Sequence, residues 1–330
     1  IRMDIESGVL TADSKLPSKR SFAQHLGVSL ITVENSYSQL LAEGYIRSEE
    51  KKGYYVEKIE KKIENTEIPE DSEIENELPE DFDNKLFPFT IWAKIMRDEL
   101  SENQTKLLTK PPFEGVYELR KAISEHLRNF RNIQASPNQI IIGAGTEYLY
   151  MLINILFGSN YIFGLEDPGY SKIANIYNEY NIKCEYIPMM EDGMDMDYLK
   201  KNKVDIIHIS PSHHFPTGVV TSIGKRYALL EWASKSPDRY IIEDDYDSEF
   251  RLSGKPVSSL YGIDVIDKVI YMNTFSKSLA STIRISYMVL PKSLMKRFHE
   301  RLGFFSCPVS TFEQHTLARF IGEGYFERHI

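Results

Sequence analysis

Seven short β-prone runs alternate with helical stretches from Lys85 to the end of the chain. This alternation is typical of a mostly parallel sheet covered by helices, because neighbouring parallel strands need a crossover connection between them. The sequence therefore predicts an α/β domain over residues 85–330 with a seven-stranded, mostly parallel sheet. The predicted strands are Ile140–Ile142, Tyr161–Leu165, Cys184–Ile187, Asp205–Ile209, Tyr240–Ile242, Lys268–Met272 and Ile285–Leu290.

Polar and aromatic residues follow the first two of these runs, at the sheet edge where ligands bind in such folds. Gly143-Ala144-Gly145-Thr146-Glu147 precedes an apolar helix. The free backbone N–H groups at the start of that helix suit a phosphate. The second run leads into Glu166-Asp167-Pro168-Gly169-Tyr170. The Tyr170 ring can stack there on a flat cofactor, or pack as an ordinary core tyrosine.

Opposite charges follow the fifth and sixth runs. Glu243-Asp244-Asp245-Tyr246 brings acids directly out of a buried strand, and burying a carboxylate is costly without a cationic partner such as a protonated pyridine nitrogen. Asn273-Thr274-Phe275-Ser276-Lys277 places a lysine at the same edge, and Arg284 follows seven residues later. A lysine partly removed from water and near other cations can form a Schiff base, although a Ser-Lys pair by itself is more often a solvated surface feature.

The first 57 residues carry a separate pattern of two capped helices. Ser18 can cap a helix that ends at Gly27, and Ser29 can cap a second helix that ends at Gly44. Two β-prone runs come next, Tyr45–Arg47 and Tyr54–Val56. The turn between them carries Lys51 and Lys52 at its tip. The segment therefore predicts a winged helix-turn-helix.

Four strings follow one another in this segment: Leu16-Pro17-Ser18-Lys19-Arg20, Leu26-Gly27-Val28-Ser29, Thr32-Val33 and Glu43-Gly44-Tyr45-Ile46. In this order they resemble the GntR-type winged-helix regulators. That resemblance implies a double-stranded DNA operator, with the second helix in the major groove. The family usually has Arg directly after the turn serine, where this chain has Leu30, so one DNA contact is lost. The alternative is a small helical adaptor with ordinary surface lysines. The candidate DNA-binding residues are Lys19, Arg20, Ser29, Thr32, Lys51 and Lys52.

The net charge of -9 is unevenly distributed, which matters for a DNA-binding prediction. Residues 1–57 carry 7 Lys/Arg against 8 Asp/Glu, whereas residues 58–84 carry 3 against 11. Residues 58–84 are also poor in aromatics, so they cannot bury enough apolar surface to order themselves. We predict an extended acidic linker there, between a DNA-binding domain at residues 1–57 and the α/β domain.

The ordered set of residues at the strand ends resembles the fold-type I enzymes that depend on pyridoxal phosphate, across essentially all of residues 85–330. By that resemblance Lys277 holds the cofactor as an internal aldimine, Asp244 pairs with the pyridine nitrogen, Tyr246 hydrogen-bonds the ring oxygen and Tyr170 stacks on the ring. The phosphate is cradled by Gly145, Thr146, Ser276 and Arg284. Glu147 and Thr274 complete the candidate cofactor-binding set.

The two halves in this order resemble the MocR family of regulators, of which GabR-type proteins are members. Strings that carry the resemblance are Pro211–Gly218, Glu243–Phe250 and Gly324–Ile330. True aminotransferases usually carry Asn-Pro-x-Gly where this chain has Phe215-Pro216-Thr217-Gly218, so an asparagine that contacts the ring oxygen is missing. His213 or His214 can substitute for it, or both are structural histidines.

We therefore expect a cytoplasmic, homodimeric transcriptional regulator that senses pyridoxal phosphate, γ-aminobutyrate or another amine through an aldimine at Lys277. The chain has no apolar run long enough to span a membrane and no secretory signal pattern. Cys184 and Cys307 are the only cysteines, which excludes a disulfide framework and the usual zinc sites. The rival interpretations are a working aminotransferase with an accessory DNA-binding domain and a pseudo-enzyme that binds no cofactor. We expect weak or partial transamination at most.

The chain starts at Ile1 and stops at Ile330, within a predicted helix. We expect missing sequence at both ends, including the arginine that usually binds an amino-acid carboxylate in fold-type I enzymes.

Overall fold

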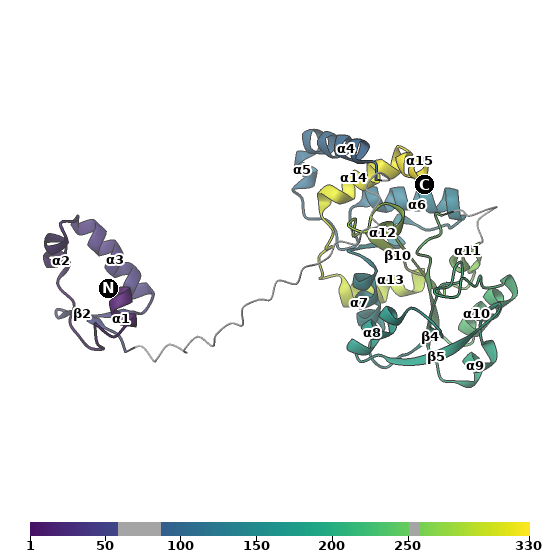
Figure 1. Cartoon of the computed structure of the whole chain (residues 1–330), viewed down its shortest axis with the longest axis horizontal. Helices are drawn as coiled ribbons and strands as arrows, with labels where there is room; N and C mark the ends of the chain where they lie inside the picture. Colours follow the sequence, from purple (N-terminus) through teal and green to yellow (C-terminus); the bar gives the residue numbers. More distant parts are fainter. Residues whose placement is uncertain (59–86, 251–257) are drawn as a thin grey trace. The chain divides into compact units, whose positions relative to one another are not determined.

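The computed structural model describes residues 1–58, 87–250 and 258–330. The chain divides into two compact units, Ile1–Glu80 and Asp81–Ile330, and each is described by itself (Figure 1). The predicted acidic linker, residues 58–84, lies outside the described residues except for Lys58, so its extended form stays a prediction.

The smaller unit contains the predicted helix-turn-helix and wing. Ser18 accepts a hydrogen bond from the Ser21 N–H at 3.2 Å, and Ser29 accepts one from the Thr32 N–H at 3.1 Å, so both predicted N-caps are confirmed. Gly27 ends the first of these helices with a left-handed φ of 65°. The elements are α1 (Arg2–Glu6), α2 (Lys19–Leu26), α3 (Leu30–Ala42), β1 (Ile46–Glu49) and β2 (Gly53–Val56).

The core of this unit forms around α3. Val33, Tyr37 and Leu40 recur at helical spacing and are buried against residues of α2 and the wing. The Tyr37 hydroxyl donates to the Pro17 carbonyl at 3.0 Å, which ties α3 to the segment before α2. Helix α1 has no apolar periodicity that would predict it, but its Ile5 side chain is buried in the same core.

The larger unit is built on an eight-stranded sheet in the order β3-β10-β9-β8-β7-β4-β5-β6. Neighbouring strands from β9 through β5 are parallel, whereas β10 is antiparallel to both of its neighbours. The strands are β3 (Ile140–Gly143), β4 (Ile162–Asp167), β5 (Lys183–Met190), β6 (Gly193–Met194), β7 (Ile206–Ile209), β8 (Tyr240–Asp244), β9 (Val269–Thr274) and β10 (Ser286–Val289).

The mostly parallel sheet is confirmed, and the prediction of seven strands is wrong by one. The eighth strand, β6, has only two residues and returns antiparallel beside β5, so it is too short to show a period in the sequence. Five of the predicted strands, β3, β4, β5, β8 and β9, extend further at their carboxyl ends than predicted. Asp244 is the last residue of β8, and Thr274 is the last residue of β9.

Helices cover both faces of this sheet. On one face α4, α6 and α14 pack against Ile140, Ile142 and Tyr271, while α9 and α10 pack against Ile207 and Ile241. The strand residues that alternate with these point to the other face of the sheet, where they pack against α7 and α13. The remaining helices are short. The helices are α4 (Phe89–Glu102), α5 (Gln104–Leu107), α6 (Tyr117–Arg131), α7 (Thr146–Phe157), α8 (Ser171–Glu179), α9 (Met196–Lys201), α10 (Ile223–Ser234), α11 (Leu260–Ile263), α12 (Phe275–Ser278), α13 (Lys292–Leu302), α14 (Thr311–Gly322) and α15 (Tyr325–His329), with a 3-10 turn at Pro137–Gln139.

Within the described residues, no helix is long and apolar enough to cross a membrane.

Candidate functional site

A cavity of about 670 Å³ lies at the carboxyl ends of β4, β7, β8 and β9. Nine of the ten predicted cofactor-binding residues line it. The tenth, Gly145, adjoins it, because a Cβ atom on Gly145 would lie 2.5 Å from a guanidinium nitrogen of the cavity residue Arg284. The structure therefore brings the whole predicted set together. The nine are Thr146, Glu147, Tyr170, Asp244, Tyr246, Thr274, Ser276, Lys277 and Arg284.

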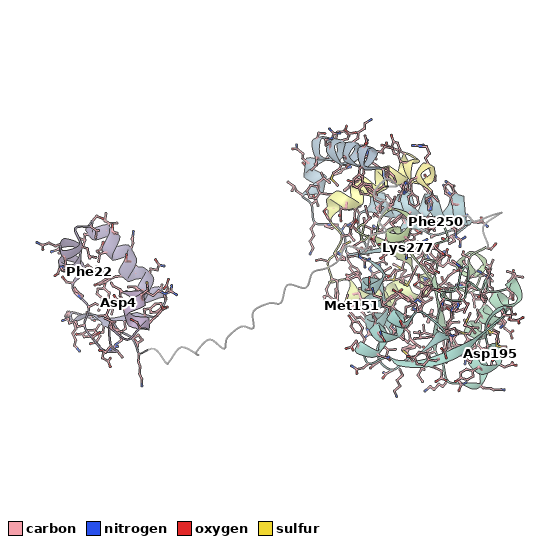
Figure 2. The ribbon with its side chains drawn as sticks, in the orientation of Figure 1. Asp4, Phe22, Met151, Asp195, Phe250 and Lys277 are labelled. Atoms are coloured by element: carbon pink, nitrogen blue, oxygen red, sulfur yellow. The ribbon has the colours of Figure 1, made fainter. Side chains whose placement is uncertain are left out.

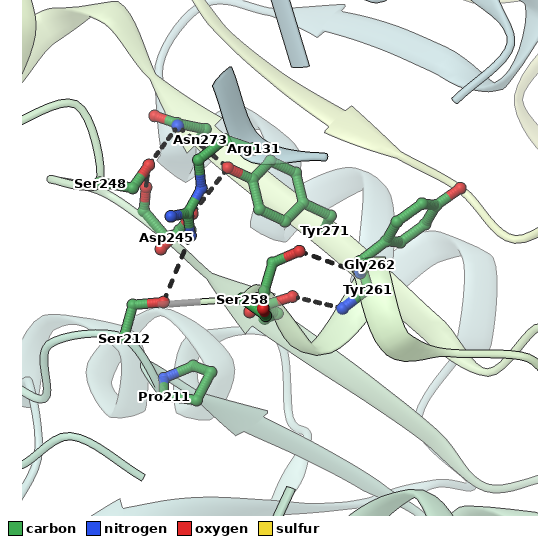
Figure 3. A network of polar contacts seen from close by, with 12 residues as sticks. Arg131, Pro211, Ser212, Asp245, Ser248, Ser258, Tyr261, Gly262, Tyr271 and Asn273 are labelled. Atoms are coloured by element: carbon green, nitrogen blue, oxygen red, sulfur yellow. Dashed lines mark hydrogen bonds and ion pairs between the residues drawn. The ribbon is translucent and has the colours of Figure 1, made fainter. Parts of the chain in front are cut away.

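The three consecutive acids at the end of β8 have different surroundings. Glu243 accepts backbone N–H groups of Leu260 and Tyr261 at 2.7 and 2.8 Å. Asp245 binds Arg131 at 2.6 Å and accepts the Tyr271 hydroxyl at 2.7 Å, in the network drawn in Figure 3. Asp244, between them, lines the cavity. Side chains alternate along a strand, so the outer two acids turn toward arginines of the protein, although Oδ1 of Asp245 has no hydrogen-bond partner among the described residues. The middle acid turns toward the cavity instead.

Asp244 itself is only half satisfied. Its Oδ2 accepts the Tyr150 hydroxyl at 2.8 Å, and Nε2 of His208 lies 3.5 Å from the same oxygen. Its Oδ1 is buried and has no hydrogen-bond partner among the described residues. A buried carboxylate oxygen without a donor costs free energy, and a protonated ring nitrogen would supply both the donor and the opposite charge.

Tyr150 binds this carboxylate directly, and Tyr177 contacts it only through His208. Tyr177 shares a 2.8 Å hydrogen bond with Nδ1 of His208. Burial, together with the charge of Asp244, raises the pKa of both tyrosines well above the usual value, so both remain phenols. Sequence reasoning missed Tyr150 and His208, because an aromatic residue in an apolar helix and a histidine in a buried strand both look like core.

The cavity end nearest α7 is cationic but internally paired. Gly145 caps α7 with a φ of 86° and gives it no side-chain hydrogen bond, so the first N–H groups of the helix face outward. Arg284 donates to Oε2 of Glu147 at 2.6 Å, and Lys172 donates to Oε1 at 2.5 Å. Ser276 donates its hydroxyl to the Ile283 carbonyl at 2.8 Å, which holds the loop before Arg284 against α12.

Lys277 lies on α12, the short helix that follows β9 (Figure 2). The sequence predicts a lysine partly removed from water, but the side chain is exposed where it lines the cavity. Phe275 and Ser278 take the buried positions of this four-residue helix, which leaves Lys277 on its outer side. Its ammonium makes no hydrogen bond or ion pair within the described part of the chain.

The missing asparagine is replaced by an aromatic contact. Phe215 packs edge-on against Tyr170 with ring centroids 5.7 Å apart, and both rings line the cavity. Neither nearby histidine lines it: His213 binds Asp247, and His214 is buried with Nδ1 2.6 Å from the Thr217 hydroxyl. These contacts favour the structural interpretation of both histidines.

Two further side chains define the polar wall of the cavity. The Tyr246 hydroxyl donates to the His213 carbonyl at 3.2 Å, and burial raises its pKa to about 12. Glu166, which no sequence argument singled out as a site residue, accepts the Ser210 N–H at 3.0 Å. Burial raises the pKa of this carboxyl to about 8. Both groups therefore carry a proton near neutral pH.

The predicted DNA-binding residues are mostly exposed on the smaller unit. Arg20, Ser29, Thr32, Lys51 and Lys52 are exposed, although Ser29 also caps α3 and Lys52 pairs with Glu49 at 3.2 Å. Lys19 is less available, because it lies 3.5 Å from the Glu34 carboxylate and over the Tyr54 ring. Their role in DNA binding stays a prediction.

The first turn of α3 also exposes apolar side chains. Leu30 and Ile31 are 38% and 68% exposed, and Val28 just before them is 42% exposed. Leu30 is at the position where the resemblance to GntR-type regulators predicts Arg.

Comparison with known proteins assigns each unit to a family model. Residues 1–56 match the model described as bacterial regulatory proteins, gntR family, and residues 75–324 match aminotransferase class I and II. The second match starts within the predicted linker.

Relatives of known sequence match along the whole chain. The chain is 38% identical over 337 residues to the uncharacterized HTH-type transcriptional regulator YdeL of Bacillus subtilis, covering 99% of this chain and 73% of the relative. It is 31% identical to the probable rhizopine catabolism regulatory protein MocR of Rhizobium meliloti, covering 100% of this chain and 72% of the relative.

Among solved structures, an archaeal alanine:glyoxylate aminotransferase matches with a TM-score of 0.67 and 28% identity. The match covers 75% of this chain, and the chain spans 63% of that enzyme's length. The larger unit therefore has the fold of a fold-type I aminotransferase.

Proposed function

This chain belongs to the MocR-type family of transcriptional regulators, in which a GntR helix-turn-helix unit is joined to an aminotransferase-like domain, and we propose that it regulates transcription in response to a ligand at Lys277. The ligand is pyridoxal phosphate itself or an amino compound that reacts with it. The family relationship supports DNA binding and an aminotransferase-type cavity; the identity of the signal belongs to this proposal.

The observation that carries the proposal is the unpaired Oδ1 of Asp244. Oδ1 of Asp245 also lacks a donor, but Asp245 is paired with Arg131 and does not line the cavity. Asp244 lies on the cavity wall, and no arginine or lysine of the described residues pairs with it. A pyridinium nitrogen has the charge and the single N–H that this atom lacks. Gly145 adds a second sign of fit, because a side chain there would fill the space next to Arg284.

The residues that would hold the cofactor follow from the cavity wall. Asp244 would accept the ring N–H, with Tyr150 and His208 fixing the orientation of its carboxylate. Tyr170 would stack on the ring, while Arg284 and the N-terminus of α7 would bind the phosphate. When bound, pyridoxal phosphate supplies an aldehyde that condenses with amines, and Lys277 is the amine that this chain offers. Tyr246 keeps its proton, and its hydroxyl would have to turn from the His213 carbonyl to donate to the ring oxygen.

A sensor also needs two states that the ligand distinguishes. An amino compound that reacts with the bound cofactor would release the Lys277 side chain. To alter DNA binding, this compound must bind more tightly to one conformational state of the regulator than to the other. We infer a homodimer acting in the cytoplasm on paired half-sites, because helix-turn-helix units read such sites as symmetric dimers.

The second candidate function is catalysis. It is favoured by one observation, namely that every residue predicted for the cofactor lies at the cavity of a fold shared with working aminotransferases. Multiple turnover with an amino donor and a keto acceptor, unchanged after Lys19→Ala and Arg20→Ala, would support it. If the chain is a regulator, those substitutions should instead weaken its DNA binding, and its transamination should be weak or partial at most.

The deciding experiment follows cofactor absorbance and DNA binding in the same protein. The full chain is titrated with pyridoxal phosphate, and then with amino acids and γ-aminobutyrate, while the affinity for DNA selected from a random pool is measured in parallel. We expect a visible absorbance band and a ligand-dependent change in DNA affinity. Lys277→Ala should remove both.

The matched control is Lys296→Ala. Lys296 is a lysine on α13 that is 88% exposed and does not line the cavity, so its loss should change neither readout. An absorbance spectrum that is the same for the wild type and Lys277→Ala would contradict the proposal and favour a pseudo-enzyme.

A further inference from the structure

The two cations at the cationic end of the cavity already share one anionic side chain, Glu147, which offsets one of their two positive charges. Three Lys or Arg residues line the cavity: Lys172, Lys277 and Arg284. Lys277 is the amine assigned to the cofactor's aldehyde, so two cations remain for its phosphate. Both of them bind Glu147, one at each carboxylate oxygen, at 2.5 and 2.6 Å.

Glu147 is held in this place as an anion. Burial would raise the pKa of its carboxyl, but the hydrogen bond from Lys172 and the charge of Arg284 outweigh that effect and keep the pKa below its usual range. It also lies in the first turn of α7, where an acid is stabilised by the helix dipole. The helix N-terminus and both cations thus already have an anion of their own.

A phosphate group entering this end meets a competitor. To bind Arg284 it must displace or share the guanidinium with Glu147, and the carboxylate then lies close to a phosphate dianion. A neutral side chain of the same shape would offer the same space without that repulsion. The structural alternative is that Glu147 only orders Arg284, in which case its charge leaves phosphate affinity unchanged or improves it.

We propose that Glu147 is an internal competitor for the cofactor's phosphate, which keeps pyridoxal phosphate exchangeable so that occupancy of the cavity follows the free cofactor concentration. This inference rests on the proposed function, because it takes Lys277 and Asp244 as the site of the same cofactor. It adds that the cofactor itself is a signal. A site can report the free concentration of a ligand only if the affinity for that ligand leaves the site partly empty.

The test compares two ligands that differ only in the phosphate. Pyridoxal phosphate and pyridoxal are titrated by absorbance into the full chain of the wild type and Glu147→Gln. We expect Glu147→Gln to bind pyridoxal phosphate about tenfold more tightly at low salt, since one like charge next to the phosphate is removed. Pyridoxal, which has no phosphate, should change by less than about twofold.

Asp192→Asn is the matched control. Asp192 makes a comparable 2.7 Å ion pair with Lys225, and neither residue lines the cavity, so the same loss of charge there should change neither affinity. Glu147→Ala serves as a second variant if Glu147→Gln does not fold, as judged by circular dichroism, and it should shift the affinities in the same direction.

The outcomes separate this inference from the proposed function. If the wild type binds pyridoxal phosphate but neither variant binds it more tightly, the competitor role is wrong and the cofactor site stands. Equal tightening for pyridoxal also overturns the inference, because the effect then does not act on the phosphate. If no form of the chain binds the cofactor, the proposed function and this inference both fail.

Discussion

Asp244→Asn and Asp245→Asn make the same chemical change at neighbouring residues, and the structure predicts opposite consequences. Each has one buried oxygen without a hydrogen-bond partner among the described residues, but Asp244 lines the cavity, whereas Asp245 is buried away from it and binds Arg131 and Tyr271. The first substitution should weaken cofactor binding while leaving the fold intact. The second should destabilise the fold.

The expected magnitudes follow from these contacts. A hydrogen bond between charged groups contributes about 1.5–3 kcal/mol, so Asp244→Asn should raise the dissociation constant of pyridoxal phosphate by about 10- to 100-fold. Thermal stability of the cofactor-free protein should change by less than about 3 °C, because the substitution removes a buried charge that the protein satisfies only in part. Breaking a buried ion pair costs about 3–5 kcal/mol, so Asp245→Asn should lower the melting temperature by roughly 10 °C.

The assay pairs an absorbance titration with thermal unfolding of the cofactor-free protein. Each variant serves as the other's control, since the change in charge and size is the same and the two aspartates are adjacent, one the last residue of β8 and the other the next residue. The reasoning is refuted if Asp245→Asn retains wild-type stability while losing cofactor affinity, or if Asp244→Asn binds the cofactor as tightly as the wild type. Either result would mean that β8 presents the opposite face to the cavity.

Three further predictions follow from single side chains. Glu166 has a folded-state pKa of about 8, raised above the ordinary 4.5 by burial, so the stability it contributes is complete below pH 4.5 and is lost as the pH rises through 8. Urea unfolding at pH 5 and pH 8 should therefore show a loss of a few kcal/mol in the wild type and a smaller loss in Glu166→Gln; equal losses would contradict the assignment. Leu30→Arg should tighten DNA binding and steepen its log-log salt dependence by about one, measured by fluorescence anisotropy, and an unchanged slope would place residue 30 away from the phosphates. Gly145→Ala should weaken pyridoxal phosphate binding at least about tenfold by absorbance titration, because its Cβ would lie 2.5 Å from Arg284 and its φ is 86°; wild-type affinity would show that the phosphate end is elsewhere.

The sequence predicts that the candidate cofactor-binding residues lie close together because they follow strand ends. Gly145, Tyr170 and Lys277 each follow a β-prone run directly, so the position of the run places the residue. The partners that lie within regular elements are different. Arg131 on α6 and Tyr150 on α7 have the spacing of ordinary helix residues, and only the fold brings them to the acids of β8.

Solvent exposure and charge pairing also escape prediction from sequence. Lys277 is exposed because other positions of the short helix α12 face inward. Four residues are too few to show a helical period, so the sequence does not predict this. Glu147 binds both Arg284 and Lys172 because the loop before β10 and the start of α8, which are far apart in the sequence, meet at α7. Long-range electrostatics of this kind has no local signature in the sequence.

The alternation of acids along β8 supplies the strongest link between sequence and function. Burying three acids in a row costs free energy unless each carboxylate has a hydrogen-bond donor or a cation beside it. Because side chains alternate along a strand, Glu243 and Asp245 point to the same face. On that face the protein supplies Arg131 and Arg226, the second of which lies 3.9 Å from Glu243. Asp244 faces the other way, where the Tyr150 hydroxyl and His208 contact one oxygen but no arginine or lysine of the described residues pairs with it. A charge that the chain buries and does not itself neutralise calls for a ligand that brings the opposite charge, and the protonated ring of the proposed cofactor would bring it.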